Sequence, residues 1–329
     1  MDASYVDRAR LVPLLAAMVL TTLWAGATTT QDVAVKTGWN AVWLEVSPSN
    51  ASPGDVFAGT PVDLVEGFYP TLTTVEFISD PSDDLWKSPG WALWAAPGRQ
   101  ESAFNSLATL DGARGYLVHS LADTIVSVSG EPTCTPLRWT ANSLNFTGFP
   151  VEAGGGLTFA AFFDGSAAHA SLRAYRLIDG RWRRISSPSS ATVEAGTAYW
   201  IYCTGRSDWQ GPLEVDVTGA DGIDFADVAD GVELLLSNRG TVPLTAAITP
   251  TVGSLPLCVE QRDPADLSLS YPSLTPGLDL GTIATGMALP VRIQVRREKM
   301  TAVREEALLT VVGGGCLKRI PVRASLPTP

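Results

Sequence analysis

Lysine and histidine are scarce in this chain of 329 residues, which has four lysines and two histidines, His119 and His169. Two histidines exclude a multi-histidine metal site, and the helical His-Glu-x-x-His pattern is absent. Neither Ser120 nor Ser166, the serines near the histidines, stands in a Gly-x-Ser-x-Gly elbow. Phosphate-binding glycine motifs are also absent. The sequence therefore predicts no enzyme, no cofactor and no metal site.

Long apolar runs are also rare, and the longest, Leu11–Trp24, follows two arginines and ends in Ala25–Ala27. A positive start, a short apolar core and a small-x-small exit are the parts of a secretory signal peptide. The run is shorter than the about 20 apolar residues that a membrane-spanning helix needs. We expect residues 1–27 to be a signal peptide, and the protein to be periplasmic, on the outer surface or extracellular, without stable membrane insertion after cleavage.

Positive charge is in deficit, with 23 basic against 34 acidic residues and a net charge of −11. This balance argues against nucleic acid or an anionic membrane surface as the main partner. The chain also has 30 glycines and 23 prolines. Frequent turns, short alternating apolar segments and the lack of a long helical stripe indicate an all-β protein.

Four cysteines follow the expected signal peptide, and none of them forms a C-x-x-C pair. Zinc or redox chemistry is therefore not indicated. An even count in an oxidising compartment predicts two disulfides, and three pairings are open. We favour Cys134–Cys203 and Cys258–Cys316, because each pair then stays within one expected domain.

Two segments of the chain repeat a common pattern. Gly38–Val46 and Arg138–Phe146 both alternate like strands with a tryptophan near the start, 100 residues apart at Trp39 and Trp139. Leu110–Val118 and Val193–Ile201 both carry a glycine turn before an aromatic and aliphatic strand. The sequence thus predicts two related β-modules, 28–132 and 133–212, followed by an immunoglobulin-like β-sandwich of seven strands at 213–329.

The clearest local prediction is a hairpin at Asp179-Gly180, between the alternating segments Leu172–Ile178 and Arg181–Ser187. Asp-Gly between two such segments favours a two-residue turn. That turn sets Leu177 opposite Trp182 and Tyr175 opposite Arg184.

Several motifs resemble known families. The motifs Ile223–Val228, Ser237–Gly240 and Pro243-Leu244 resemble, in this order, the ASPM/SPD-2/Hydin type of immunoglobulin-like domain, with Ala226 where that pattern has glycine. Residues 38–212 resemble a family of exported bacterial surface proteins. The shared motifs are Gly-Trp-Asn-Ala-x-x-Leu-Glu-Val at 38–46, Val-Phe-Ala-Gly-x-Pro-Val at 56–62 and Gln-Gly-Pro-Leu at 210–213. The resemblance implies architecture and export and supplies no catalytic residue.

Two groups of residues are candidates for binding. Trp86, Trp91 and Trp94 crowd one segment, and exposed indole rings stack on sugars, although tryptophan in a β-module also fills cores. The hairpin is basic, and guanidinium groups bind carboxylate or phosphate in a forked geometry, although a solvated face is the simpler interpretation. Its arginines are Arg173, Arg176, Arg181, Arg183 and Arg184.

A third group is acidic. Asp80, Asp83 and Asp84 cluster in one loop without the spacing of a calcium loop, and either a solvated turn or calcium remains open. Two carboxylates are also what a glycoside hydrolase needs, and no pair is singled out here.

These observations favour an exported, non-enzymatic structural or interaction protein that presents or tethers a protein partner. The alternative is a carbohydrate-binding module that uses exposed tryptophans, and glycoside hydrolysis ranks third. A sugar platform requires Trp86, Trp91 or Trp94 to be exposed on a flat face. An interaction protein predicts buried rings and an exposed apolar patch or sheet edge elsewhere.

Overall fold

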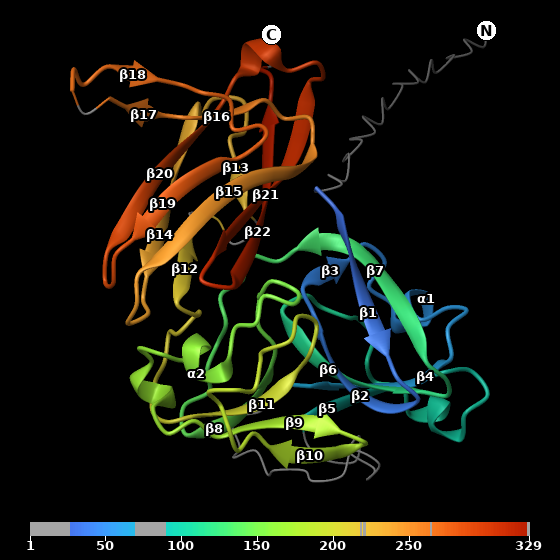
Figure 1. Cartoon of the computed structure of the whole chain (residues 1–329). Helices are drawn as coiled ribbons and strands as arrows, with labels where there is room; N and C mark the ends of the chain where they lie inside the picture. Colours follow the sequence, from blue (N-terminus) through green and yellow to red (C-terminus); the bar gives the residue numbers. More distant parts are fainter. Residues whose placement is uncertain (1–26, 70–89, 218, 220–221, 264, 328–329) are drawn as a thin grey trace, which may run out of the picture.

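The computed structural model describes residues 27–69, 90–217, 219, 222–263 and 265–327. Strands dominate it and its helices are single turns, so the chain is all-β, as the sequence predicts. Two β-modules lie at one end of the molecule and a β-sandwich at the other (Figure 1). The expected signal peptide up to residue 26 and the segment 70–89, with Trp86 and the acidic cluster, lie outside the described residues.

Module 1 is built from two antiparallel sheets whose apolar faces enclose a valine-rich core. One sheet has the order β1-β7-β3, from β1 (Thr29–Val35), β7 (Thr124–Pro132) and β3 (Val46–Pro48). The other has the order β2-β6-β4-β5, from β2 (Gly38–Leu44), β6 (Arg114–Ser120), β4 (Val62–Phe68) and β5 (Trp91–Ala95). A one-turn helix α1 (Pro53–Val56) precedes β4, and a 3₁₀ turn (Gln100–Phe104) follows β5.

Module 2 has one antiparallel sheet in the order β10-β9-β11-β8. Its strands are β8 (Ser143–Thr147), β9 (Ala174–Ile178), β10 (Arg181–Arg184) and β11 (Tyr199–Cys203). The one-turn helix α2 (Phe159–Phe162) and a 3₁₀ turn (Ala167–His169) precede β9. Phe159 and Phe162 are buried in the same core as Tyr199 and Ile201, so this segment covers one face of the sheet.

The two modules share their connectivity, which makes them related units. In each four-stranded sheet, the strand that comes first in the chain is followed by a one-turn helix, two hairpin strands and a last strand. That last strand lies between the first strand and the hairpin, in β2-β6-β4-β5 as in β8-β11-β9-β10. Both helices have the same length and follow a hydroxyl residue, Ser52 or Thr158.

An asparagine on each of the equivalent strands β2 and β8 makes equivalent hydrogen bonds. Its side-chain amide donates to the carbonyl two residues earlier and to a carbonyl of the last strand. These bonds run from Asn40 to Gly38 (3.0 Å) and Val118 (3.3 Å), and from Asn145 to Ser143 (3.1 Å) and Ile201 (3.4 Å). Asn40 and Asn145 are therefore equivalent.

The expected match of Trp39 with Trp139 is wrong by five positions, since Asn40 and Asn145 are 145 − 40 = 105 residues apart. Leu144 takes the place of Trp39. Trp139 lies before β8, where its ring packs on His169 at 4.5 Å and its indole nitrogen donates to the Trp209 carbonyl. Trp139 and Trp39 therefore make different contacts, although they hold similar positions in the repeated sequence pattern.

The closing tyrosines are equivalent as well. The Tyr116 hydroxyl accepts a hydrogen bond from the backbone nitrogen of Asp111 (2.7 Å), and the Tyr199 hydroxyl accepts one from Glu194 (3.0 Å). In both cases the donor lies five residues earlier. Both tyrosines are 1% exposed, so each fixes the turn that leads into its strand.

Replacing Tyr116 or Tyr199 with phenylalanine leaves one backbone N–H without its acceptor and keeps the ring. We expect each substitution to lower the free energy of unfolding by about 1 kcal/mol. Urea unfolding followed by tryptophan fluorescence measures the loss. A loss at one tyrosine and none at the other would contradict their structural equivalence.

An aromatic cluster joins the two modules. Trp200 of β11 is 1% exposed, and its ring centroid lies 5.0 Å from Phe146, 5.2 Å from Phe68 and 6.4 Å from Trp91. Because side chains alternate along a strand, Tyr199 faces the core of its own module while Trp200 faces module 1. We call this group the aromatic cluster; it also includes Leu117 and Trp182.

In the described part of the sandwich, nine strands form two sheets, rather than the expected seven. One sheet has the order β12-β14-β20-β16, from β12 (Leu213–Asp216), β14 (Gly231–Asn238), β20 (Ala288–Val295) and β16 (Leu257–Val259). The other has the order β13-β22-β21-β15-β19, from β13 (Ile223–Asp224), β22 (Cys316–Ser325), β21 (Arg304–Gly313), β15 (Leu244–Gly253) and β19 (Leu278–Ile283). A small hairpin of β17 (Gln261–Arg262) and β18 (Leu269–Ser270) and a 3₁₀ turn (Arg297–Lys299) complete it.

Two sequence motifs of the sandwich have clear structural roles. Asn238 closes its loop, because its side chain donates to the carbonyls of Val242 and Ile283 and accepts from the nitrogen of Gly240. Ala226, where the resembled pattern has glycine, has φ of +45°. This is a left-handed conformation that glycine adopts without strain.

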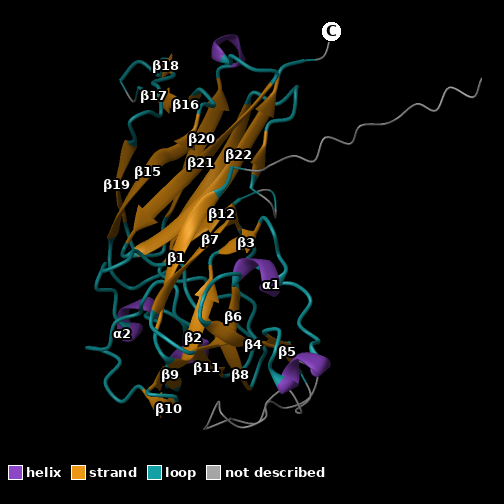
Figure 2. Cartoon of the chain, turned by 90° about the vertical axis from the view of Figure 1, so that its right-hand side faces the viewer, coloured by secondary structure: helices purple, strands orange, loops and turns teal. Residues whose placement is uncertain are grey.

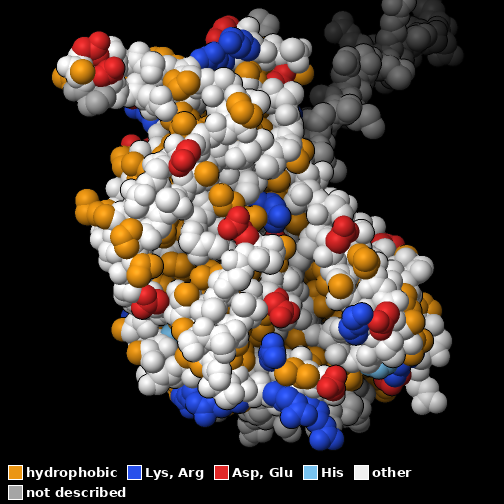
Figure 3. Space-filling view, in the orientation of Figure 1, with side chains coloured by type: hydrophobic (Ala, Val, Ile, Leu, Met, Phe, Trp, Pro, Cys, Tyr) orange, Lys and Arg blue, Asp and Glu red, His pale blue; other side chains and the backbone are white. Residues whose placement is uncertain are grey.

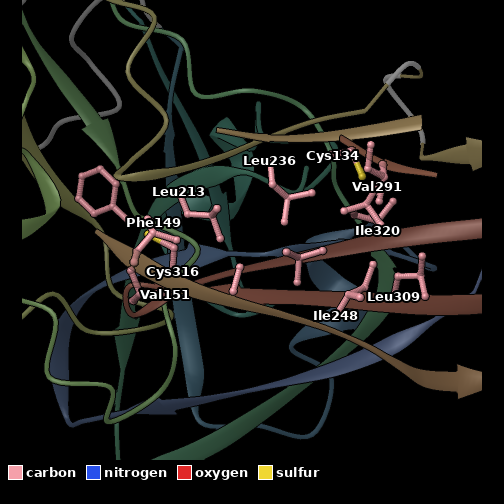
Figure 4. Packing of buried hydrophobic residues seen from close by; sticks show 14 of the residues in the cluster. Cys134, Phe149, Val151, Leu213, Leu236, Ile248, Val291, Leu309, Cys316 and Ile320 are labelled. Atoms are coloured by element: carbon pink, nitrogen blue, oxygen red, sulfur yellow. The ribbon is translucent and has the colours of Figure 1, made fainter. Parts of the chain in front are cut away.

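Module 2 and the sandwich share one continuous core. Val151 pairs with Cys316 at the start of β22, and Leu317 donates to the carbonyl of Pro150 (2.9 Å). Figure 4 shows Phe149 and Val151 beside Leu213 and Cys316 in this core. A side view shows the modules and the sandwich as one elongated body (Figure 2). The expected domain border at 212/213 is therefore a border between sheets, with a core that continues across it.

Candidate interaction surface

The β9–β10 hairpin is the candidate surface, and a two-residue turn sets its geometry. Asp179 (φ +50°) and Gly180 (φ +72°) both have left-handed backbones, as a type I′ turn requires. Leu177 lies opposite Trp182, and Tyr175 lies opposite Arg184. The predicted register is confirmed.

Three arginines share one face of the hairpin. Arg183 lies opposite Arg176, and strand alternation places Arg181 on the same face. Arg184 lies on the opposite face, with Trp182. Arg176, Arg181, Arg183 and Arg184 are all exposed. Like charges directly across a sheet are destabilising, so folding alone does not account for Arg176 beside Arg183.

No residue within the described ranges forms an ion pair with these four arginines. Arg173, at the base of the hairpin, instead has its guanidinium carbon 3.4 Å from the centre of the Tyr202 ring. Elsewhere arginines do pair with carboxylates: Arg99, Arg114, Arg239, Arg292, Arg297, Arg319 and Arg323. Basic side chains gather at the lower end of the molecule in Figure 3, where β8, β9 and β10 lie in Figure 1. Positive charge without an ion-pair partner among the described residues is thus concentrated here on an acidic protein.

Trp91 and Trp94 do not form the flat exposed platform that the carbohydrate-binding alternative requires. Trp91 is 9% exposed, and its ring lies 5.2 Å from Phe68 in the aromatic cluster. Trp94 is half-buried with its ring 6.0 Å from Phe57. Trp91 is therefore buried, as an interaction protein requires and a sugar platform does not, because module 2 covers the face of the sheet on which it lies. Trp86 lies outside the described residues.

The structure adds a residue that the sequence did not single out. Trp182 pairs with Leu177 as Trp91 pairs with Phe68, so Trp91 and Trp182 hold equivalent positions on the two hairpins. Both are buried in the aromatic cluster. The signal available in the sequence was a tryptophan at the start of each second hairpin strand.

The acidic cluster is not tested by the structure. Asp80, Asp83 and Asp84 lie outside the described residues, so the calcium alternative keeps the status of a prediction. In the part of the chain that the structure describes, no three His, Cys, Asp or Glu side chains gather as a metal site.

All four cysteines lie in the described part of the chain, and each is a buried thiol instead of half of a disulfide. The expected Cys258–Cys316 bond is wrong because the two lie at opposite ends of the sandwich. Cys258 lies beside the strand end that pairs with the start of β14, whereas Cys316 contacts Leu213, which pairs with the end of β14. Eight residues of strand separate these ends by about 20 Å, and a disulfide needs Cα atoms within about 7 Å.

The expected Cys134–Cys203 bond is also wrong. The Cys134 sulfur donates to the carbonyl of Arg319 on β22 (3.6 Å), while the Cys203 sulfur donates to Gly205 at the end of β11 (3.4 Å). The Cys134 side chain therefore contacts the sandwich. Burial raises the pKa of Cys316 to about 11, which suppresses its reactive thiolate.

Thiol titration tests this correction. We expect the native protein to react slowly with 5,5′-dithiobis(2-nitrobenzoate), because the sulfurs are buried, and the urea-unfolded, unreduced protein to release four equivalents. Release of no more than two equivalents after unfolding would contradict the assignment of four thiols.

Each histidine belongs to a polar contact inside a module. His119 Nδ1 lies 2.5 Å from the buried carboxylate of Asp63, which also pairs with Arg99. Asp63 sits at a β-bulge of β4, and bulges redirect side chains in this way. His169 Nδ1 lies 2.7 Å from the Ser166 hydroxyl, and burial lowers the pKa of His169 to about 4. A histidine that gives up its proton so readily is a weak base for activating Ser166.

A cavity of about 440 Å³ lies where the modules meet the sandwich. Glu45 of module 1 pairs there with Arg319 of β22, and burial raises the pKa of Glu45 despite this partner. Burial lowers the pKa of Lys318, whose ammonium donates to the Cys134 carbonyl (3.3 Å). The Glu45–Arg319 pair links module 1 to the sandwich, and the Lys318–Cys134 bond links module 2 to it.

Within the residues that the structure describes, no helix is long and apolar enough to cross a bilayer.

No family model matches the chain, and no curated protein matches it. Among solved structures, an ASH/PapD-like domain of human CEP192 is similar over 36% of this chain and 87% of its own length (12% identity, TM-score 0.24). The periplasmic chaperone SfaE matches 36% of this chain and 59% of its own (10% identity, TM-score 0.22). The CooA pilin subunit from enterotoxigenic Escherichia coli matches 36% and 99% (9% identity, TM-score 0.22).

Proposed function

We propose that this chain is an exported, non-enzymatic interaction protein that holds a protein partner through an acidic surface of that partner. The observation that carries the proposal is the exposed group of Arg176, Arg181 and Arg183, without ion pairs to the described residues, on a chain of net charge −11.

Charge favours an acidic partner at this end of the molecule. Guanidinium groups bind carboxylates in a forked geometry and make charge-assisted hydrogen bonds. The acidity of the rest of the chain repels such a partner from other surfaces, so the long-range field orients the encounter.

A buried tryptophan also fixes the strand that carries the arginines. Trp182, between Arg181 and Arg183, is 8% exposed, with its ring centroid 5.8 Å from Phe146 and 6.3 Å from Trp200. Anchoring the hairpin in the aromatic cluster lowers the entropy lost when a partner binds.

Export is tested by fractionating cells that produce the full chain. We expect the extracytoplasmic fraction to contain a product whose first residue is Thr28, because the apolar run ends in Ala25–Ala27. An uncleaved chain confined to the cytoplasm would remove export from the proposal.

Binding is tested with fluorescent poly-L-glutamate as a stand-in for an acidic protein surface. We expect the variant R176A/R181A/R183A to bind at least about tenfold more weakly than the unchanged protein, with a shallower salt dependence. The matched control R262A/R292A/K299A removes the same charge from exposed positions of the sandwich and should bind as the parent does.

Two results would overturn the assignment. Equal weakening in both triple variants would mean that net charge alone governs binding. Arginine-dependent binding to an anionic polysaccharide such as alginate, with none to poly-L-glutamate, would replace the protein partner with a polysaccharide.

A further inference from the structure

The second hairpin strand of each module lies at the edge of its sheet, and the two edges differ in what covers them. In module 1 this strand is β5, and a following segment covers its edge. Leu93 donates its N–H to the Ser106 hydroxyl (3.0 Å), and its carbonyl accepts from the nitrogens of Ser106 and Leu107 (both 2.8 Å). Ala95 donates to the side chain of Asn105 (2.7 Å). The backbone groups of this edge are therefore satisfied within the chain.

In module 2 the equivalent strand is β10. In module 1, Leu93 pairs with Glu66, which pairs on its other side with Leu117. In module 2, Arg184 pairs with Tyr175, which pairs on its other side with Trp200. Leu117 and Trp200 each follow the equivalent tyrosine of their module directly. Arg184 therefore holds the position of Leu93.

The outward groups of β10 follow from its turn. A two-residue hairpin makes Ile178 and Arg181 a hydrogen-bonded pair, and such pairs alternate along antiparallel strands. The N–H and C=O groups of Trp182 and Arg184 consequently point away from β9. None of the described residues bonds to them, and the chain leaves the strand at Ile185, whose nitrogen returns to the carbonyl of Ala174 (2.9 Å).

We infer that the outer edge of β10 receives an extended acidic segment of the partner as a fifth strand of the module 2 sheet. The inference rests on the proposed function and states how the partner is held. The outward groups of Trp182 and Arg184 form main-chain hydrogen bonds with the incoming strand. Alternate acidic side chains of that strand then lie beside Arg181 and Arg183 on one face.

The positive charge of β10 argues against a second copy of this chain as the occupant. Two β10 edges brought together would place arginine beside arginine, and like charges on edge strands prevent such pairing. An acidic strand converts the same side chains into attractive contacts. The four residues of β10 span about 13 Å, so the contacting part of the partner is four to six residues long.

The probe is an eight-residue peptide that alternates glutamate with valine or threonine, together with two twins. One twin is N-methylated at every glutamate and the other at every remaining residue. All three peptides carry equal charge, and alternate N–H groups of a strand point to opposite sides. We expect one twin to bind at least about tenfold more weakly than the parent peptide and the other to bind within about threefold of it.

A protein variant tests the same edge independently. Arg184→Pro removes an outward N–H without touching the bonds to β9, and edge strands accept proline at such positions. Arg184→Ala is the matched control, because it loses the same charge. We expect Arg184→Pro to weaken peptide binding at least about fivefold beyond Arg184→Ala, with an unchanged circular dichroism spectrum.

The two proposals fail in different ways. If both twins bind like the parent peptide and Arg184→Pro equals Arg184→Ala, strand addition is wrong while arginine-dependent binding of poly-L-glutamate still supports the proposed function. If the parent protein binds neither the peptide nor poly-L-glutamate, the proposed function fails and this inference fails with it.

Discussion

The packing of the two module sheets across the aromatic cluster is the constraint on which the arrangement of modules 1 and 2 depends. Trp200 is buried among rings from both modules. A buried aromatic side chain removes about 150–250 Å² from water, worth on the order of 4 kcal/mol at about 25 cal/mol per Å². Among the described residues, neither sheet has a second layer of its own on this face, so each module supplies the cover that the other needs. The cluster also orients the hairpin, because Trp182 anchors β10 while its neighbours remain in solvent.

The two modules share one strand arrangement and differ at the hairpin and at the outer edge of the sheet. Both keep the strand order, the asparagine bonds and the buried tyrosine. They differ at the hairpin, since residues 69–90 join β4 to β5 whereas two residues join β9 to β10. They differ also at the outer edge, which Ser106 and Leu107 cover in module 1 alone among the described residues. Module 2 further shares its core with the sandwich, so its exposed hairpin stands on a large rigid body.

The sequence predicted those features that depend on neighbouring residues. The all-β class follows from turns and alternation, and the register of Leu177 with Trp182 follows from Asp179-Gly180, because a two-residue turn leaves one pairing available. Features that depend on distant packing were missed. Strand parity places Trp91 on one face of β5 but does not show that another module covers that face. Membership of one expected domain suggested Cys134 with Cys203, although Cys134 contacts β22. The repeat was found with its first strand in the wrong register, since the asparagine bonds that define it link residues 78 and 56 positions apart.

Amide hydrogen exchange at two equivalent residues tests the central claim, that β10 has an open edge where β5 has a covered one. Leu93 and Arg184 occupy the same sheet position, and only the N–H of Leu93 has a partner among the described residues. We predict that the Arg184 amide exchanges close to the rate of an unstructured chain, and the Leu93 amide at least about a hundredfold more slowly. Equal protection of the two amides would show that the edge of β10 is already covered, and would contradict the account.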